Sequence, residues 1–168
     1  YKVILEFDEA FWDQSVDYFG SAIDSAENRG RSFMFWNLVP VSGKPMLISL
    51  IAGDAAKSAE TEGSESIVKS VLATLARICF PEDPSKMPPL KQSLVTRWQS
   101  DPYARGSYSY VATGSKGASD YDDLGKPEGR VLFAGELTCK EHPDTVGGAM
   151  LTGWRAARQA LAIARGKE

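Results

Sequence analysis

The pattern of apolar and polar positions predicts three strands in the first third of the chain. Residues 2–7, 32–39 and 46–53 are runs of apolar, aromatic and β-branched side chains, the composition that favours strands. The last two runs are joined by the turn-forming sequence "PVSGKP", which predicts a hairpin of two largely buried strands. We therefore expect these three segments to share one sheet.

The spacing of apolar residues changes over residues 64–80. Apolar side chains recur there at steps of three and four, which is typical of an amphipathic helix packed on one side. They are Ile67, Val68, Val71, Leu72, Leu75 and Ile78. Ser64 is the predicted N-cap and Pro81 the end of the helix.

The rest of the chain alternates between loops and short elements. A proline-rich connector over 81–89 precedes another predicted strand over 92–98, and the charged, glycine-containing segment 114–130 is predicted to be a surface loop. Residues 131–136, "VLFAGE", predict a short buried strand, and a final helix is expected from about Gly147. Its apolar face consists of Ala149, Met150, Trp154, Ala157, Leu161 and Ala164.

Length and composition are those of one ordinary globular domain. Of the 168 residues, 43% are hydrophobic and 24% charged, which excludes a disordered or fibrous chain. The net charge is −3 and the basic residues are scattered, so we expect no direct nucleic-acid binding. The longest apolar run, 46–53, is far below the roughly 20 residues of a membrane helix, so we expect no membrane span.

Cysteine and histidine usage restricts the chemistry further. Cys79 and Cys139 stand at no metal-ligand spacing, and the chain has one histidine, His142. This pattern predicts a reducing compartment without disulfides and argues against a zinc site or a histidine-based triad. We expect no metal.

Two features are candidates for chemistry. Residues 97–115 concentrate four large aromatic side chains, Trp98, Tyr103, Tyr108 and Tyr110, in a segment that is otherwise loop and strand end. Taken alone, such residues fit a core or a turn as well as a binding surface. The second feature is the sequence "DTVGGAM", which opens the last helix; free N–H groups at a helix start favour an anion or a hydrogen-bond acceptor, although plain packing explains the glycines equally.

Taken together, the sequences "KVILEFDEAFWD", "FMFWNL", "RWQSDPYARGSYSYVATG", "FAGE" and "TVGGAMLTGWRAA" resemble the C-terminal half of the flavin-containing amine oxidases. Within that superfamily they are most similar to the lysine-specific histone demethylases. The match runs from Lys2 to about Ala164. No G-x-G-x-x-G sequence follows a strand in this chain, so the resemblance implies that the FAD fingerprint lies upstream of residue 1.

The resemblance implies an α/β fold that is one part of a larger amine oxidase domain. Residues 1–112 are expected to form the substrate-binding part, with a mixed sheet and a covering helix. Residues 113–168 are expected to supply the C-terminal strand and helix of a Rossmann-like FAD-binding domain.

It also implies two catalytic residues. Tyr108 would flank the substrate amine, because the face of its ring suits a methylammonium that must lose water and a proton. Arg105 and Gly106 would fix the turn that presents it. Lys2 would hold a water against the flavin N5 and relay a proton, and a desolvated position there would lower its pKa.

The implied flavin contacts lie in both parts of the chain. Trp98 would pack against the isoalloxazine ring and Tyr103 would lie at its rim, while Glu136 would contact the ribityl and pyrophosphate part. Thr145 and Val146 would direct main-chain N–H groups to the N1/O2 edge, which becomes negative on reduction. Ser107 and Gly135 complete the implied cofactor-binding set.

The implied reaction is oxidation of mono- or dimethyl-lysine on a histone tail, which gives formaldehyde, and H₂O₂ when O₂ reoxidises the flavin. The implied protein is nuclear, with a possible corepressor partner bound through regions outside this chain. Thr145 favours this substrate, because many amine oxidases have an aromatic residue there, and threonine leaves room for a peptide-borne lysine. Two alternatives remain: a polyamine or monoamine oxidase, and a non-catalytic scaffold that kept the fold without the cofactor. The chain alone is expected to be inactive.

Overall fold

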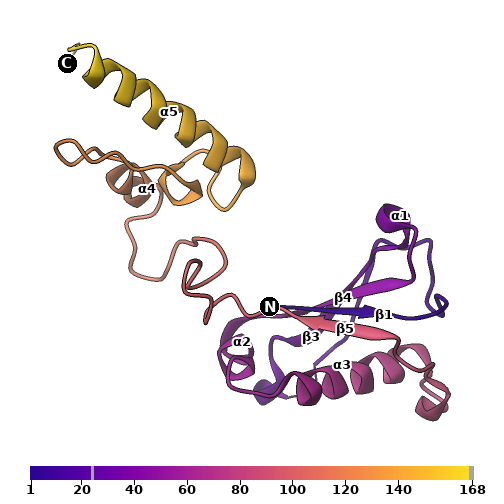
Figure 1. Ribbon diagram of the computed structural model, residues 1–168. Helices are drawn as coiled ribbons and strands as arrows, with labels where there is room; N and C mark the ends of the chain where they lie inside the picture. The colour runs from indigo at the N-terminus through magenta and orange to yellow at the C-terminus, as the bar shows by residue number, and fades with distance from the viewer. Residues whose placement is uncertain (24, 167–168) are drawn as a thin grey trace. The chain divides into compact units, whose positions relative to one another are not determined.

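The structure, a computed structural model, describes residues 1–23 and 25–166. They divide into two compact units, one up to Gly106 and one from Ser107. The first unit contains a sheet with a long helix, and the second contains mainly helices (Figure 1). The expected functional boundary at 112/113 lies six residues beyond this division and stays a prediction.

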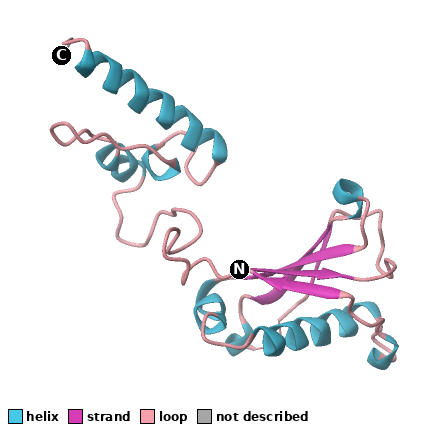
Figure 2. Cartoon of the chain, in the orientation of Figure 1, coloured by secondary structure: helices cyan, strands magenta, loops and turns pink. Residues whose placement is uncertain are grey.

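The sheet of the first unit has five strands in the order β2-β3-β4-β1-β5. The strands are β1 (Lys2–Glu6), β2 (Tyr18–Gly20), β3 (Arg31–Asn37), β4 (Met46–Ile51) and β5 (Gln92–Val95). Four predicted strands, β1, β3, β4 and β5, are therefore confirmed, as is the antiparallel pairing of β3 with β4. β2 had no clear signal in the sequence. The first strand of the chain is the inner strand between β4 and β5 (Figure 2).

The α/β class is confirmed, with one correction to the sheet. We expected a mixed sheet, but each strand pair among the described residues is antiparallel. β1 lies between β4 and β5 and runs in the opposite direction to both. β4 and β5 therefore point the same way, but they do not pair with each other.

The predicted helix is α3 (Ser64–Cys79), which lies along one face of the sheet (Figure 1). Ile67, Val71 and Leu75 are fully buried or nearly so, at a spacing of four residues. They join a core that includes Val3, Leu5, Phe7, Phe35, Leu47 and Ile51. The N-cap is Gly63, so the predicted cap at Ser64 was one residue too late.

Short elements connect the strands. They are the 3₁₀ turns η1 (Ala26–Asn28) and η2 (Pro84–Lys86) and the helices α1 (Val39–Ser42) and α2 (Gly53–Ala59). α2 buries Ala55 and Ala59, and it was not predicted because its small side chains give a weak periodic signal.

The second unit consists of α4 (Ala118–Leu124), the 3₁₀ turn η3 (Glu136–Thr138) and the long helix α5 (Val146–Ala164). α5 confirms the predicted final helix. α4 corrects the prediction of a loop over 114–130; it forms around Tyr121, which is 7% exposed.

One further expectation for the second unit was wrong. Residues 131–136 form no buried strand: Val131 makes an isolated bridge to Glu128 and is exposed. A buried strand needs neighbouring strands for its N–H and C=O groups, and the described part of this unit contains none. The predicted apolar face of α5 is largely exposed, and the buried residues of the helix are Gly148 and Thr152.

Candidate functional site

Lys2 and the beginning of the aromatic segment lie together in the first unit. β1 and β5 pair so that Thr96 continues the ladder opposite Lys2: the Lys2 N–H donates to Thr96 Oγ1 (2.9 Å), and the Thr96 N–H donates to the Lys2 carbonyl (3.0 Å). The Lys2 ammonium lies 5.5 Å from the centre of the Trp36 ring, a cation–π distance. Lys2 is exposed, so the first unit by itself does not supply the expected desolvated environment.

The loop of residues 97–106, which follows β5, is held by hydrogen bonds to the connection between the end of α2 and the start of α3. The Arg97 guanidinium donates to the carbonyl oxygens of Ala59, Glu60 and Glu62. The Glu60 carboxylate accepts the N–H groups of Gln99 and Ser100 through one oxygen, while its other oxygen is buried and has no hydrogen-bond partner within the described chain.

The loop then closes on itself. The Asp101 carboxylate accepts the N–H groups of Tyr103 and Ala104, and the Gly106 N–H donates to the Trp98 carbonyl (2.9 Å). Arg105 has a positive φ of 50°, so the expected turn at Arg105 and Gly106 exists. Tyr103 stands on this loop with 98% of its surface exposed, and Trp98 is about half exposed. Their flavin contacts stay predictions.

Tyr108 belongs to an extended segment of the second unit, in which Ser107 and Tyr110 are also exposed. Tyr108 is 68% exposed. This segment is held through Ser109, whose N–H donates to Glu136 Oε1 (3.0 Å) and whose hydroxyl donates to Glu136 Oε2 (2.6 Å).

Glu136 is partly buried, and its carboxylate is occupied by contacts within this unit. Its Oε2 also accepts the Asp144 N–H at 2.8 Å. Burial raises the pKa of the carboxyl, but the hydrogen bonds from Ser109 and Asp144 outweigh that effect and leave the pKa below its ordinary value. Glu136 is thus held as a carboxylate.

The start of α5 fits an electron-rich acceptor. Thr145 is the N-cap: its Oγ1 accepts the Gly148 N–H (2.9 Å) and donates to the His142 carbonyl (2.8 Å). Helix geometry leaves the N–H groups of Val146 and Gly147 without an intrahelical partner, and Val146 is 88% exposed. The start of this 19-residue helix therefore presents N–H groups and the positive end of the helix dipole, which favour an electron-rich acceptor. The contact of Thr145 and Val146 with the flavin stays a prediction.

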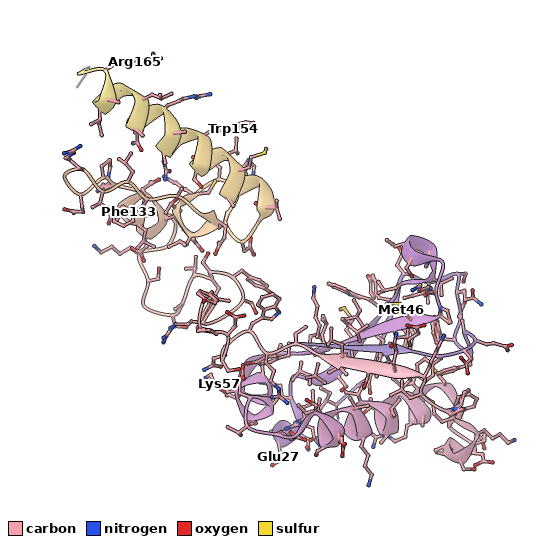
Figure 3. All side chains as sticks on the ribbon, viewed as in Figure 1. Glu27, Met46, Lys57, Phe133, Trp154 and Arg165 are labelled. Atoms are coloured by element: carbon pink, nitrogen blue, oxygen red, sulfur yellow. The ribbon has the colours of Figure 1, made fainter. Side chains whose placement is uncertain are left out.

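The predicted site residue Gly135 has a φ of 129°, which only glycine adopts without strain. The Thr152 hydroxyl fixes this turn through the N–H and carbonyl of Gly135, both at 3.0 Å. The Arg155 guanidinium donates to the carbonyl oxygens of Thr138 and Phe133. α5 thereby holds the segment that carries Glu136; the labelled Phe133 and Trp154 locate this segment and helix in Figure 3.

The sequence did not indicate the residues that arrange these segments. Arg97 and Glu60 bind main-chain groups of distant residues, and Ser109 binds the Glu136 carboxylate across 27 positions of sequence. Neither spacing nor a local motif predicts such contacts. The Asp101 turn was detectable, because Asp followed by Pro is a turn signal.

Two structural features are absent from the described residues. No helix in the ranges 1–23 and 25–166 is long and apolar enough to cross a membrane. The same ranges contain no cluster of three or more His, Cys, Asp or Glu side chains that could hold a metal ion.

Comparison with solved structures gives the fold. A putrescine oxidase bound to putrescine superimposes with a TM-score of 0.73 at 20% identity, covering 96% of this chain and 34% of the oxidase. At that identity the similarity establishes the fold and not the substrate.

Curated relatives are more similar in sequence. "Lysine-specific histone demethylase 1 homolog 3" of Arabidopsis thaliana is 47% identical over 98% of this chain, and "Histone demethylase-like protein A" of Aspergillus fumigatus is 44% identical over 95%. "Possible lysine-specific histone demethylase 1" of Drosophila melanogaster is 42% identical over 93%. The chain spans 10%, 15% and 18% of the length of these three relatives.

The family profile described as "Flavin containing amine oxidoreductase" matches residues 1–161. This match covers nearly the whole chain and agrees with the fold and with the open helix start of α5. The chain therefore belongs to the flavin-containing amine oxidoreductases, with FAD as the cofactor.

Proposed function

We propose that the protein containing this chain removes methyl groups from mono- and dimethyl-lysine on histone tails by FAD-dependent oxidation. The observation that carries the proposal is the similarity to relatives named as histone demethylases, at 42–47% identity over almost the entire chain. The putrescine oxidase shares only 20%. A nuclear location is part of the proposal for the same reason.

The small side chain at the start of α5 supports a peptide substrate. Thr145 uses its hydroxyl to cap the helix, so the side chain at this position is compact and turned to its own backbone. A lysine still attached to a peptide needs such space, because its backbone must remain outside while the methylated nitrogen reaches the flavin.

Bound FAD would supply the two-electron acceptor for the amine. The neutral methylamine loses a hydride from its methyl carbon, and the nitrogen lone pair forms the C=N bond. Water then adds to that carbon, and formaldehyde leaves from the lysine nitrogen. Because trimethyl-lysine has no lone pair, it is not a substrate.

The chain's own residues have the following proposed roles. The Tyr108 ring provides an open π face that accommodates the methylammonium before its deprotonation. Lys2 holds a water and relays a proton, and the N–H groups of Val146 and Gly147 stabilise negative charge at the ring edge. A corepressor partner and the remainder of the oxidase domain would bind or pack through other parts of the protein.

The test uses the intact protein and its Lys2→Ala variant. We expect oxidation of a dimethyl-lysine peptide, with formaldehyde released, and a rate of flavin reduction lowered on the order of 100-fold or more in the variant while FAD stays bound. Lys86→Ala, at another exposed lysine, is the matched control. A preference for spermine or benzylamine would favour the amine-oxidase alternative, and a protein without flavin absorption would favour the scaffold alternative.

A further inference from the structure

One carboxylate in the second unit connects the two segments to which the proposed function assigns substrate and flavin. Glu136 accepts the N–H and hydroxyl of Ser109, the residue after Tyr108. It also accepts the N–H of Asp144, the residue before Thr145. A single side chain thereby fixes the backbone beside the amine-facing ring and the backbone beside the helix start.

The segment that carries Tyr108 depends on this contact. Residues 107–111 belong to no helix or strand, and the hydrogen bonds recorded for them in the described structure all involve Ser109. Two of the three go to Glu136, and the third is a 3.5 Å contact between the Ser109 and Tyr121 hydroxyls. The conformation of Tyr108 is therefore controlled mainly through its neighbour.

The Asp144 side of the contact is equally specific. Asp144 has a φ of 54°, an unfavourable backbone region for a residue with a side chain. The hydrogen bond from its N–H to Glu136 compensates this conformation, and Thr145 begins α5 immediately afterwards.

Glu136 is itself held in place from α5. Thr152 binds the N–H and the carbonyl of Gly135, the residue before Glu136. Arg155 binds the carbonyl and hydroxyl of Thr138, two residues after Glu136. Because the carboxylate is fixed, it can orient the groups that are hydrogen-bonded to it, as supporting residues around an active site do.

We propose that Ser109 and Glu136 form a positioning pair that sets Tyr108 and the start of α5 relative to each other. This inference rests on the proposed function for the roles of Tyr108 and α5. It assigns Glu136 a role beyond the expected contact with the cofactor: three of its roughly four acceptor sites are already used by the protein. Ser109, which no motif indicated, becomes a residue that tunes catalysis.

The first test measures main-chain hydrogen exchange in the intact protein and needs no activity. Glu136→Gln cannot accept all three hydrogen bonds, because the amide nitrogen is a donor. We expect exchange at residues 107–111 and 142–146 to rise on the order of tenfold or more, since bonds to a charged group are lost. Glu141→Gln, which removes the same charge from an exposed position in the same connection, should change neither segment.

The second test uses Ser109→Ala, a mild change that removes only the hydroxyl. Misplacement of Tyr108 should lower kcat on the order of 10- to 100-fold with a smaller change in KM, and with FAD affinity unchanged. Ser119→Ala on α4 is the matched control. The double variant Ser109→Ala/Glu136→Gln should lose less than the product of the single losses, because both remove one interaction.

The outcomes separate this inference from the proposed function. Faster exchange at both segments, in a protein that oxidises no methyl-lysine, would support the pair and contradict the substrate proposal. Normal demethylation with unchanged exchange in Glu136→Gln would overturn the pair. A loss of FAD affinity in Glu136→Gln, with Ser109→Ala fully active, would also overturn it and leave Glu136 as a cofactor contact only.

Discussion

Thr145 combines a helix cap with a small volume at the proposed entrance to the flavin. These two properties can be separated by substitution, because the cap depends on Oγ1 and the space depends on the size of the side chain. Three variants of this residue therefore test stability and substrate preference independently.

We expect Thr145→Ser to keep both properties and Thr145→Ala to lose about 1 kcal/mol of stability with the same substrate preference. Thr145→Tyr should lose the same cap and also lower kcat/KM on a dimethyl-lysine peptide, with benzylamine oxidation unchanged or raised. Thermal unfolding measures the loss of stability, and kcat/KM on the dimethyl-lysine peptide and on benzylamine measures the substrate preference. If Thr145→Tyr reduces both rates equally relative to Thr145→Ala, position 145 supports the helix and does not select the substrate.

Gly148 illustrates how closely the loop before α5 packs against the helix. A Cβ atom at this position would lie 2.0 Å from the His142 carbonyl oxygen, which is backbone and cannot rotate away. We predict that Gly148→Ala destabilises the protein by about 1–3 kcal/mol, as overpacking does.

Gly153, five residues further along α5, is the control for that prediction. A Cβ there would meet no atom within 4 Å, so Gly153→Ala should be neutral or stabilising by roughly 0.5–1 kcal/mol. Chemical denaturation of both variants gives the answer. Equal effects at the two positions would show that the His142 contact is not the cause.

At the level of elements, one ion pair ties the sheet to its covering helix. The Arg31 guanidinium on β3 lies 2.8 Å from the Glu62 carboxylate, which also accepts the Ser66 hydroxyl of α3. The hydrogen bond from Arg31, and then that from Ser66, lowers the pKa of Glu62 below its ordinary value despite some desolvation.

A pH dependence follows from that direction. A carboxyl whose pKa is depressed by folding contributes stability that is complete above the unfolded-state pKa of about 4.3. The contribution is lost as the pH falls from there through the lower folded-state pKa. We expect the stability difference between the protein and Glu62→Gln to shrink over that range. A difference that stays constant on acidification would contradict the assignment.

Elements were predictable from sequence wherever burial imposed a strong period. The spacing of Ile67, Val71 and Leu75 predicted α3, and "KVILE" predicted β1. The run 131–136 has the same apolar character, yet forms no strand, because strand formation depends on partners that composition cannot specify. The same limit applies to the site. The aromatic residues could be identified from the sequence as candidates, whereas the Ser109–Glu136 contact depends on tertiary structure.

At the level of the whole molecule, the second unit exposes many apolar side chains. Val131, Phe133 and Leu137 are exposed beside α5, together with Met150 and Trp154 on the helix. Exposed apolar surface of this kind is typical of a face that packs against other protein. The chain also spans only 10%, 15% and 18% of the length of the three curated relatives.

We therefore predict that the 168-residue chain alone binds FAD poorly. Isothermal titration of this chain with FAD should give little heat. A longer protein that includes the glycine-rich fingerprint should bind FAD and show a flavin absorption spectrum. Micromolar or tighter binding by residues 1–168 would contradict this prediction and would place the main cofactor contacts within the chain.

The position of β1 in the sheet has a consequence for synthesis on the ribosome. Val3 pairs with Ser49 and also with Val95, so β1, which is made before both of its partner strands, completes its hydrogen bonds only when β5 has emerged. At roughly 5–20 residues per second, the apolar strand stays partly unpaired for several seconds. A nascent chain that stalls before Gln92 would present an open edge of β1, the kind of surface that chaperones retain and that pairs with other unfinished chains.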